Sequence, residues 1–351
     1  MFYILGPCAA ESREQVLETA EQICSQLSAI SIPQSAFIFR AGVWKPRTSP
    51  HTFQGAGEAA LAWLQEVKER FGMPVATEAA TPEHVEAAMK AGVDYLWIGA
   101  RTSANPIAVE AIASQIKNSK SKNNKYPLRG VLIKNPVNAD AALWLGNIER
   151  LERTGVPVTA VHRGCNHQPC WAMAHAVRQA RPDIPMLLDP SHMSGDAKQV
   201  PALIEKGAEL GLDGAMVEVH YQPSEALSDA GQQISPEGLT AALKDHFVER
   251  PLTLKDRSAE RLELNWLRAE IDELDDRLWD TIAQRMDVSR RIGVWKKAHG
   301  VAPLQPNRYQ QIVEKLKIKN DALKMNGTAL GEEFMARMWE LIHEESLKRQ
   351  E

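Results

Sequence analysis

The chain has 351 residues, of which 44% are hydrophobic and 25% charged, and its formal net charge is −4. This composition excludes collagen-like and disordered chains, and four cysteines are too few for a disulfide scaffold of this length. With no apolar run long enough to cross a membrane, no signal peptide and a mildly acidic balance, we expect a cytoplasmic protein that binds neither membranes nor nucleic acid.

The first 250 residues alternate short apolar runs with amphipathic stretches. The runs are unbroken, as in strands that are buried on both faces of a parallel sheet, and they are Phe2–Leu5, Ala36–Phe39, Pro74–Ala76, Tyr95–Ile98, Val131–Ile133, Val158–Val161, Met186–Leu188 and Ala215–Val219. Helical patterns lie between them, over residues 14–27, 57–71, 82–91, 105–116 and 139–154, and turn glycines follow at Gly72, Gly92, Gly155 and Gly211. Eight such repeats predict a (β/α)8 barrel, and a doubly wound sheet is the alternative.

Positively charged residues cluster directly after the apolar runs. Barrel enzymes build their sites at the carboxyl ends of the strands, so residues in these positions are expected to share one mouth. Cations gathered in a protein of negative net charge predict a ligand with phosphate and carboxylate groups. These cations are Arg40, Lys45, Arg47, Arg101, Lys134 and Arg163.

A second set of residues has the chemistry of metal ligands. Cys8 follows the first run, His192 follows the seventh, Glu218 ends the eighth, and Asp229 lies in the loop beyond it. One thiolate, one imidazole and two carboxylates suit one divalent ion such as Mn, Fe, Co or Zn, without selecting among them. Cys165 and Cys170 with His167 are an alternative zinc half-site, for which the sequence offers no second half.

After residue 250 the sequence changes character. Residues 251–258 resemble a linker, and from Ala259 a stripe of apolar residues at spacings of three and four predicts one helix to about Ala298: Leu264, Leu267, Ile271, Leu274, Leu278 and Ile282. Pro303 and Pro306 end it, and shorter helices are expected over residues 307–319 and 331–350. A first helix ~55–60 Å long cannot be covered by two short ones, so a second copy of the chain is expected to cover it. The predicted domains are residues 1–250 and 259–351.

The motifs of residues 1–250 resemble 3-deoxy-D-arabino-heptulosonate 7-phosphate (DAHP) synthase. The strings that carry the resemblance, in chain order, are GPCAAES from Gly6, KPRTSP from Lys45, IGARTSANP from Ile98, KNP from Lys134, HRG from His162, LDPSH from Leu188 and EVH from Glu218, with Ser228-Asp229. That family condenses phosphoenolpyruvate with erythrose 4-phosphate. The resemblance implies that Cys8, His192, Glu218 and Asp229 hold the metal. It also implies that Arg40, Lys45, Arg101, Lys134 and Arg163 serve phosphoenolpyruvate, and that Lys45, Arg47 and Thr48 serve erythrose 4-phosphate. Thr102 is a further expected substrate-binding residue.

Two questions stay open for the synthase. The related octulosonate 8-phosphate synthases use arabinose 5-phosphate, and they carry a Lys-Ala-Asn-Arg type of stretch where this chain has Lys45-Pro46-Arg47-Thr48. This difference favours the heptulosonate enzyme. Lys45 and Lys134 are expected to be catalytic, but the base that activates the attacking water is not assigned between Glu78 and Lys134.

Residues 259–351 resemble the all-helical chorismate mutases, which are intertwined dimers. The matching residues are Arg268, Arg285, Lys296, Arg308, Ser346 and Gln350. By resemblance, Lys296 and Gln350 contact the ether oxygen of chorismate, the arginines bind its carboxylates, and Arg268 reaches the site of the other subunit. Arg285, Lys296 and Gln350 are the expected catalytic residues. Two positions depart from the family, because Tyr309 and Gln305 stand where acidic residues are usual, which leaves the contact to the substrate hydroxyl open.

The sequence therefore predicts a bifunctional enzyme that forms DAHP and converts chorismate to prephenate. It assembles as a homodimer through the helical domain, or as a larger oligomer. The first strand begins at Phe2, so no regulatory domain is expected before the barrel. The helical domain is accordingly expected to regulate the synthase by binding chorismate or prephenate. The alternative makes that domain mainly a sensor or a dimerisation module.

Overall fold

The computed structural model describes residues 2–30, 37–47, 49–121, 127–244, 259–324 and 327–350. The chain divides into two compact units, Met1–Ile271 and Asp272–Glu351, named here the barrel unit and the helical unit. The expected linker 251–258 and the predicted substrate residue Thr48 lie outside the described residues.

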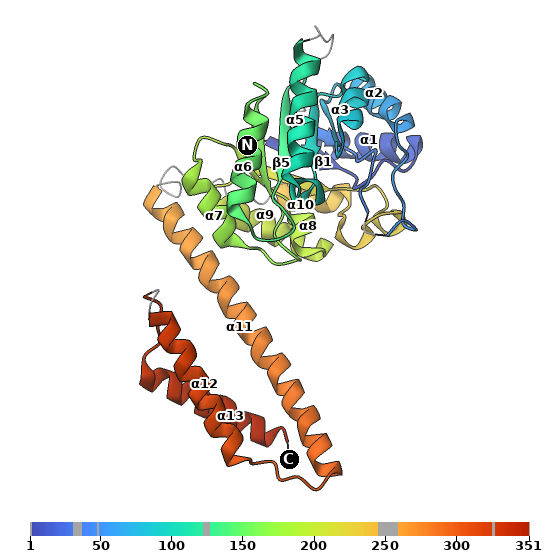
Figure 1. Ribbon diagram of the computed structural model, residues 1–351. Coiled ribbons are helices and arrows are strands. Elements are labelled where there is room, and N and C mark those ends of the chain that lie inside the picture. The colour runs from blue at the N-terminus through green and yellow to red at the C-terminus, as the bar shows by residue number, and fades with distance from the viewer. Residues whose placement is uncertain are drawn as a thin grey trace. The chain divides into compact units, whose positions relative to one another are not determined.

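The barrel unit contains eight parallel strands that close in chain order (Figure 1). The strands are β1 (Phe2–Gly6), β2 (Phe37–Arg40), β3 (Val75–Glu78), β4 (Tyr95–Ile98), β5 (Gly130–Lys134), β6 (Val158–His162), β7 (Met186–Leu188) and β8 (Gly214–Glu218). The barrel closes because β1 pairs with β8 as well as with β2, so that Tyr3 lies opposite both Ala215 and Phe37. This closed order confirms the predicted (β/α)8 barrel and excludes the doubly wound sheet.

Helices follow the strands around the barrel. They are α1 (Arg13–Ala29), α2 (Ala59–Phe71), α3 (Pro82–Lys90), α4 (Ala100–Ser103), α5 (Pro106–Ser121), α6 (Ala141–Glu152), α7 (Trp171–Ala180), α8 (Pro190–Ser194), α9 (Val200–Glu209) and α10 (Pro236–Lys244). Local sequence fixes several ends: the Ser12 hydroxyl accepts from the backbone of Gln15 at the start of α1, and Asp140 accepts from Leu143 at the start of α6. All four predicted turn glycines have φ between 66° and 73°, a region that favours glycine.

The inside of the barrel is filled rather than open. Each strand contributes one apolar side chain to an interior layer, and none is more than 5% exposed: Ile4, Ile38, Ala76, Trp97, Leu132, Val161, Leu187 and Met216. The strand faces that point outward pack against the helices in a second, larger core. Strands with both faces buried require unbroken apolar runs, which explains the sequence pattern. The residues that end the strands stand above the interior layer at the mouth.

The long helix α11 (Ala259–Ala298) begins in the barrel unit. Trp266 is 3% exposed, and its ring stacks on His175 of α7 at a centroid distance of 5.3 Å. The two imidazole nitrogens of His175 lie 2.6 Å from Glu270 Oε1 and 3.0 Å from Glu263 Oε2. The first turns of α11 therefore belong to the packing of the barrel.

The helical unit consists of the rest of α11 with α12 (Pro306–Lys324) and α13 (Glu332–Lys348). These three helices match the predicted ones, with α12 extended by one turn at its end. Five members of the predicted apolar stripe on α11 are between 45% and 58% exposed in the single chain, namely Leu264, Leu267, Ile271, Leu274 and Leu278. A helix that could cross a membrane is not found among the described residues.

Candidate active sites

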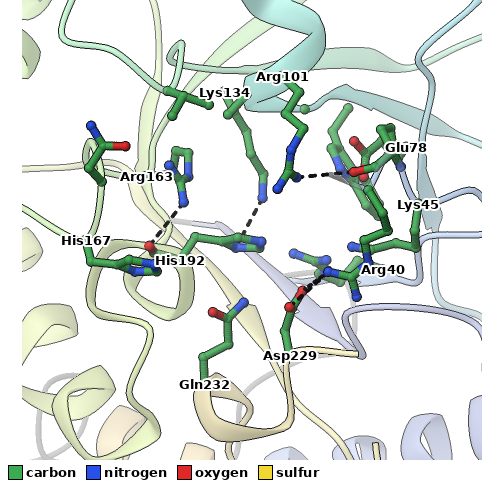
Figure 2. Close-up of a pocket in the computed structure, with 17 residues that line it drawn as sticks. Arg40, Lys45, Glu78, Arg101, Lys134, Arg163, His167, His192, Asp229 and Gln232 are labelled. Atoms are coloured by element: carbon green, nitrogen blue, oxygen red, sulfur yellow. Dashed lines mark hydrogen bonds and ion pairs between the residues drawn. The ribbon is translucent and has the colours of Figure 1, made fainter. Parts of the chain in front are cut away.

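A cavity of about 370 Å³ opens at the carboxyl ends of the strands. Arg40 ends β2, Lys134 ends β5 and Glu78 ends β3, and all three line it. Figure 2 shows the labelled side chains pointing into this cavity from around its rim, with Asp229 and Gln232 across from Arg101 and Lys134. All six predicted cations line the cavity: Arg40, Lys45, Arg47, Arg101, Lys134 and Arg163.

Arg40 is the most deeply buried of these cations. Its side chain is fully buried, and its Nη2 donates to Glu218 Oε1 at 3.0 Å. The guanidinium lies over the ring of Trp97, 4.7 Å from the ring centroid. Its Nε and Nη1 have no hydrogen-bond partner among the described residues. Buried donors are normally satisfied, so two unpaired guanidinium nitrogens at a cavity wall indicate an acceptor from a bound anion.

Lys134, Asp189 and His192 form a second buried network at the cavity. Lys134 Nζ donates to Asp189 Oδ2 at 2.6 Å, and His192 Nδ1 lies 2.9 Å from the same oxygen. Burial opposes ionisation of Asp189, but His192 and Lys134 beside it hold the pKa of that carboxyl well below its usual range. Burial also lowers the pKa of the Lys134 ammonium, which Asp189 partly offsets. The hydrogen bond that His192 Nδ1 donates to Asp189 fixes the orientation of the imidazole and leaves its Nε2 3.6 Å from Glu218 Oε1.

The four predicted metal ligands come together beside the cavity. One ligand atom each from Cys8, Glu218 and Asp229 lies within 4.8 Å of the others, the one group of at least three such residues among those the structure describes. Cys8 Sγ is 3.0 Å from Asp229 Oδ2, and His192 Nε2 is 3.6 Å from Glu218 Oε1. The alternative zinc half-site of Cys165, His167 and Cys170 forms no such group.

The electrostatics of this cluster differ between its members. Burial, with a contribution from Glu218, raises the pKa of the Cys8 thiol to about 12. Burial would raise the pKa of Asp229, but the hydrogen bond from Cys8 and the charges of Lys45 and Arg47 bring it down to about 2. Arg47 Nη1 lies 3.0 Å from both carboxylate oxygens of Asp229. The cluster thus holds ionised carboxylates beside a thiol, with cations around them.

Thr102 is the predicted substrate residue that the structure leaves away from the cavity. It belongs to the short helix α4, its side chain is 8% exposed, and it is not among the residues that line the cavity, whereas its neighbour Arg101 is. One helical turn cannot point adjacent side chains in the same direction, so Arg101 faces the cavity and Thr102 the interior.

Several residues of the site were not singled out by sequence reasoning. Asn135 accepts from the backbone of Arg163 at 2.7 Å and donates to Gly164 O at 2.9 Å, so it fixes the start of the loop after β6. Gln232 lines the cavity, and Gln233 hydrogen-bonds the backbone of Cys8. Asn135 follows Lys134 in a recognised string and could have been found there, whereas the glutamines carry no such signal.

The helical unit brings the predicted mutase residues into two pairs. Lys296 Nζ donates to Gln350 Oε1 at 2.9 Å, and Arg285 Nη1 donates to the hydroxyl of Ser346. Gly293 lets these helices approach, because a Cβ at that position would lie 2.5 Å from the Cα of Gln350. Both pairs join α11 to α13 or the residues directly after it.

The remaining mutase residues are placed differently. Arg308 is exposed in the first turn of α12 and belongs to neither pair, and Arg268 is exposed on the part of α11 that lies in the barrel unit. Tyr309 packs its ring against His343, with centroids 4.5 Å apart, while Gln305 is exposed. The two departures from the family pattern therefore place an aromatic ring and an exposed amide where carboxylates were expected.

The comparisons with known proteins agree with this geometry. A sequence model of the DAHP synthetase I family matches residues 1–247. The chain belongs to this family. A model of the type II chorismate mutases matches residues 267–351, so members of two enzyme families are joined in one chain.

Individual members of the family show how far the similarity extends. The chain is 30% identical to phospho-2-dehydro-3-deoxyheptonate aldolase of Thermotoga maritima over 240 residues, which cover 66% of this chain and 64% of that relative. It is 28% identical to 2-dehydro-3-deoxyphosphooctonate aldolase of Bordetella petrii, covering 71% and 89% of the two chains. A crystal structure of the Thermotoga maritima DAHP synthase superposes with a TM-score of 0.58 at 28% identity and covers 70% of this chain and 68% of that one. The relatives of this chain thus include both a heptonate and an octonate aldolase.

Proposed function

We propose that the barrel unit condenses phosphoenolpyruvate with erythrose 4-phosphate to DAHP, and that the helical unit rearranges chorismate to prephenate. The observation that supports the first activity most strongly is the cavity with six cations around it and a cluster of metal-ligand types at its base. The pairs of Lys296 with Gln350 and of Arg285 with Ser346 support the second.

The charges of the cavity suit two phosphorylated substrates. Arg40, with two unpaired guanidinium nitrogens at the end of β2, and Lys134, at the end of β5, are assigned to phosphoenolpyruvate together with Lys45, Arg101 and Arg163. Arg47 and Thr48, again with Lys45, are assigned to erythrose 4-phosphate. Two polyanions repel each other, so the cations hold them close together and carry the positioning part of catalysis.

The cluster at the base fits one divalent cation. Cys8, His192, Glu218 and Asp229 would hold it, and a set of one sulfur, one imidazole nitrogen and two carboxylates suits Mn, Fe, Co or Zn. When bound, the cation supplies Lewis-acid polarisation of the aldehyde carbonyl. The chain's own residues then orient the two substrates. Lys45, Arg47 and Lys134 stabilise the negative charge that develops on the aldehyde oxygen.

The reaction balances with one water molecule. A bond forms between C3 of phosphoenolpyruvate and the aldehyde carbon of erythrose 4-phosphate, and the aldehyde oxygen gains a proton. The oxygen of water adds to C2 of the phosphoenolpyruvate portion, and the bond from C2 to the phosphate oxygen breaks to release inorganic phosphate. Glu78 and Lys134 both line the cavity and are the candidates for exchanging a proton with this water.

The mutase reaction needs no acid, base or metal. The substrate is a dianion that must be held compact while an ether bond breaks, so catalysis comes from groups placed to stabilise that geometry and charge. Lys296 and Gln350 are assigned to the ether oxygen, and Arg285 and Arg308 to the carboxylates.

A second copy of the chain completes the mutase site in this proposal. Arg268 lies in the barrel unit of its own chain and is exposed, and the apolar stripe of α11 is about half exposed. A homodimer through α11 would bury that stripe and deliver Arg268 to the other copy's site, and larger assemblies can build on it. The functional domains are then residues 1–250 and 259–351, joined by residues 251–258.

Regulation of the synthase through the helical domain is the final part of the proposal. Addition of prephenate or chorismate to the full chain should slow DAHP formation, and the variant Arg285→Ala should relieve that effect. If Arg285→Ala changes neither the inhibition nor the chorismate consumption, the domain has only a structural role.

The central test assays the purified full chain for both reactions with and without a chelator. The chelator should abolish DAHP formation and spare chorismate consumption. Arg101→Ala should raise the KM for phosphoenolpyruvate by about 10–100-fold, the loss of one charge-assisted contact, whereas Arg150→Ala on α6 should not. Faster turnover of arabinose 5-phosphate than of erythrose 4-phosphate would instead support the octulosonate reaction, and absence of both reactions would refute the proposal.

A further inference from the structure

Two adjacent glutamines, Gln232 and Gln233, lie beside the proposed cation site without contributing a ligand. Gln232 is the last residue of the short 3-10 helix η4 (Ala230–Gln232), and Gln233 directly follows it, in the loop that carries Asp229. Gln232 is 7% exposed and Gln233 1% exposed. Buried amides need specific partners, and both of these side chains find them on the segments that carry the ligands.

Gln233 connects the segment after β1 with the loop after β8. Its Oε1 accepts from the backbone N–H of Cys8 at 3.0 Å, and its Nε2 donates to the carbonyl oxygen of Ser228 at 2.8 Å. A backbone N–H can only donate and a carbonyl can only accept, so the orientation of this amide is fixed by its partners. Ser228 directly precedes Asp229, and Gln233 therefore ties the segment of one ligand to the segment of another.

Gln232 fixes the third ligand. Its Nε2 donates to Glu218 Oε2 at 2.7 Å, while Arg40 Nη2 donates to Glu218 Oε1 at 3.0 Å. Each carboxylate oxygen thus uses one of its lone pairs for a hydrogen bond and keeps another for a cation. The carboxylate plane is set by these two donors before any ion is present.

The loop that carries Asp229 lies outside the strands of the barrel, so side-chain contacts are needed to hold it in place. Asp229 has a φ of 51°, a left-handed conformation that is uncommon for residues with a side chain. The loop returns to the barrel through Ile234, whose backbone N donates to Glu218 O at 3.0 Å. Between that anchor and Asp229, the two glutamines provide the side-chain contacts to Cys8 and Glu218.

We propose that Gln232 and Gln233 are positioning residues that hold Cys8, Glu218 and Asp229 at ligand separation before a divalent cation binds. The inference rests on the proposed metal-dependent function and deepens it. Ligands prearranged in this way lose less freedom on binding, so the glutamines set the affinity for the cation rather than its chemistry. They act on the cation through the ligands that they hold, and neither amide is itself one of the proposed ligands.

The test measures binding of Mn²⁺ alone to the full chain, after removal of bound metal, by the electron paramagnetic resonance signal of free Mn²⁺. Gln232→Leu and Gln233→Leu should each raise the Kd by about 10–100-fold, as loss of partners behind metal ligands does. Gln222→Leu is the matched control: it makes the same change on an exposed side chain of the same loop and should bind as the wild type does. Saturating Mn²⁺ should restore DAHP formation in both variants because their ligands are intact.

A milder variant protects the test against loss of folding. Gln233→Asn keeps an uncharged amide with the same donor and acceptor but is one methylene shorter, so its affinity should lie between those of wild type and Gln233→Leu. Folded variants that bind Mn²⁺ with wild-type affinity would overturn the inference. It would also be overturned if the substitutions unfold the metal-free barrel, or if excess Mn²⁺ does not restore DAHP formation. A wild-type chain that binds no Mn²⁺ would overturn the proposed metal site itself, which is a distinct result.

Discussion

His162 ends β6 inside the barrel wall and should make the barrel sensitive to acid. Its ring lies between those of Trp144 and Trp171, with centroid distances of 6.1 Å and 5.4 Å. Its Nε2 is 2.7 Å from the carbonyl oxygen of Pro169, which can only accept, so Nε2 carries the proton of a neutral ring. Nδ1 has no partner among the described residues. Burial lowers the pKa of this imidazole from 6.5 to about 4.

The size of the effect follows from that difference. In the unfolded chain the imidazole of His162 is protonated below about pH 6.5, whereas in the folded chain it is protonated only below about pH 4. The unfolded state therefore binds more protons throughout this window, and stability falls as the pH falls. A pKa difference of about two to three units corresponds to about 3 kcal/mol of unfolding free energy, fully present above pH 6.5 and lost by about pH 4.

The variant His162→Gln isolates this contribution. Glutamine keeps an N–H donor for Pro169 O but does not titrate, so the other acid-sensitive groups are the same in both proteins. Urea unfolding of the barrel, followed by tryptophan fluorescence across the window, should show a shallower decline of stability with acid for the variant, by about 3 kcal/mol in total. Equal declines in the two proteins would refute the assignment of a buried neutral imidazole.

Three further predictions concern other parts of the chain. Trp266→Ala should lower the free energy of unfolding of the barrel by about 3–5 kcal/mol, measured by urea denaturation, because it empties a buried site on α7. Gly99→Ala should lower kcat/KM for DAHP formation at least about 10-fold, because the added Cβ would lie 2.1 Å from Glu78 Oε1 and displace that carboxylate; an unchanged value would mean that Glu78 has no part in the reaction. Lys296→Met should slow chorismate consumption by about 10²–10³-fold, the cost of one such contact, without reducing DAHP formation in the absence of prephenate, as Gln350→Leu should also do.

Much of the barrel could be predicted from the sequence because the physical signal is local. A strand buried on both faces must be apolar at every position, so a run such as Val131–Ile133 reveals the strand. The residue at the carboxyl end of a barrel strand lies at the mouth, so Lys134, directly after this run, is indicated as a site residue. The long helix was predictable to its last residue for a similar reason, since its apolar spacing continues until the prolines.

The contacts that sequence reasoning missed depend on partners far along the chain. Gln233 lies 225 residues from Cys8, and an amide gives no local pattern that points to such a partner. The stripe on α11 was identified as the packing face of one helix, yet in the barrel unit Trp266 and Ala269 on another face are buried, while Leu264 and Leu267 are exposed. A helix that packs on two different partners carries two apolar faces, and periodicity alone does not say which one meets the barrel.

The seam between β1 and β8 has a consequence for how the enzyme is assembled. Cys8 and Asp229 lie 221 residues apart and meet only because the first strand pairs with the last. Contacts this distant in the chain form late and slowly during folding. The proposed cation site is therefore incomplete until the ring of strands has closed, and a partly folded barrel offers its thiol without the carboxylates that accompany it. If the site takes up an ion as proposed, that uptake reports that the barrel has closed.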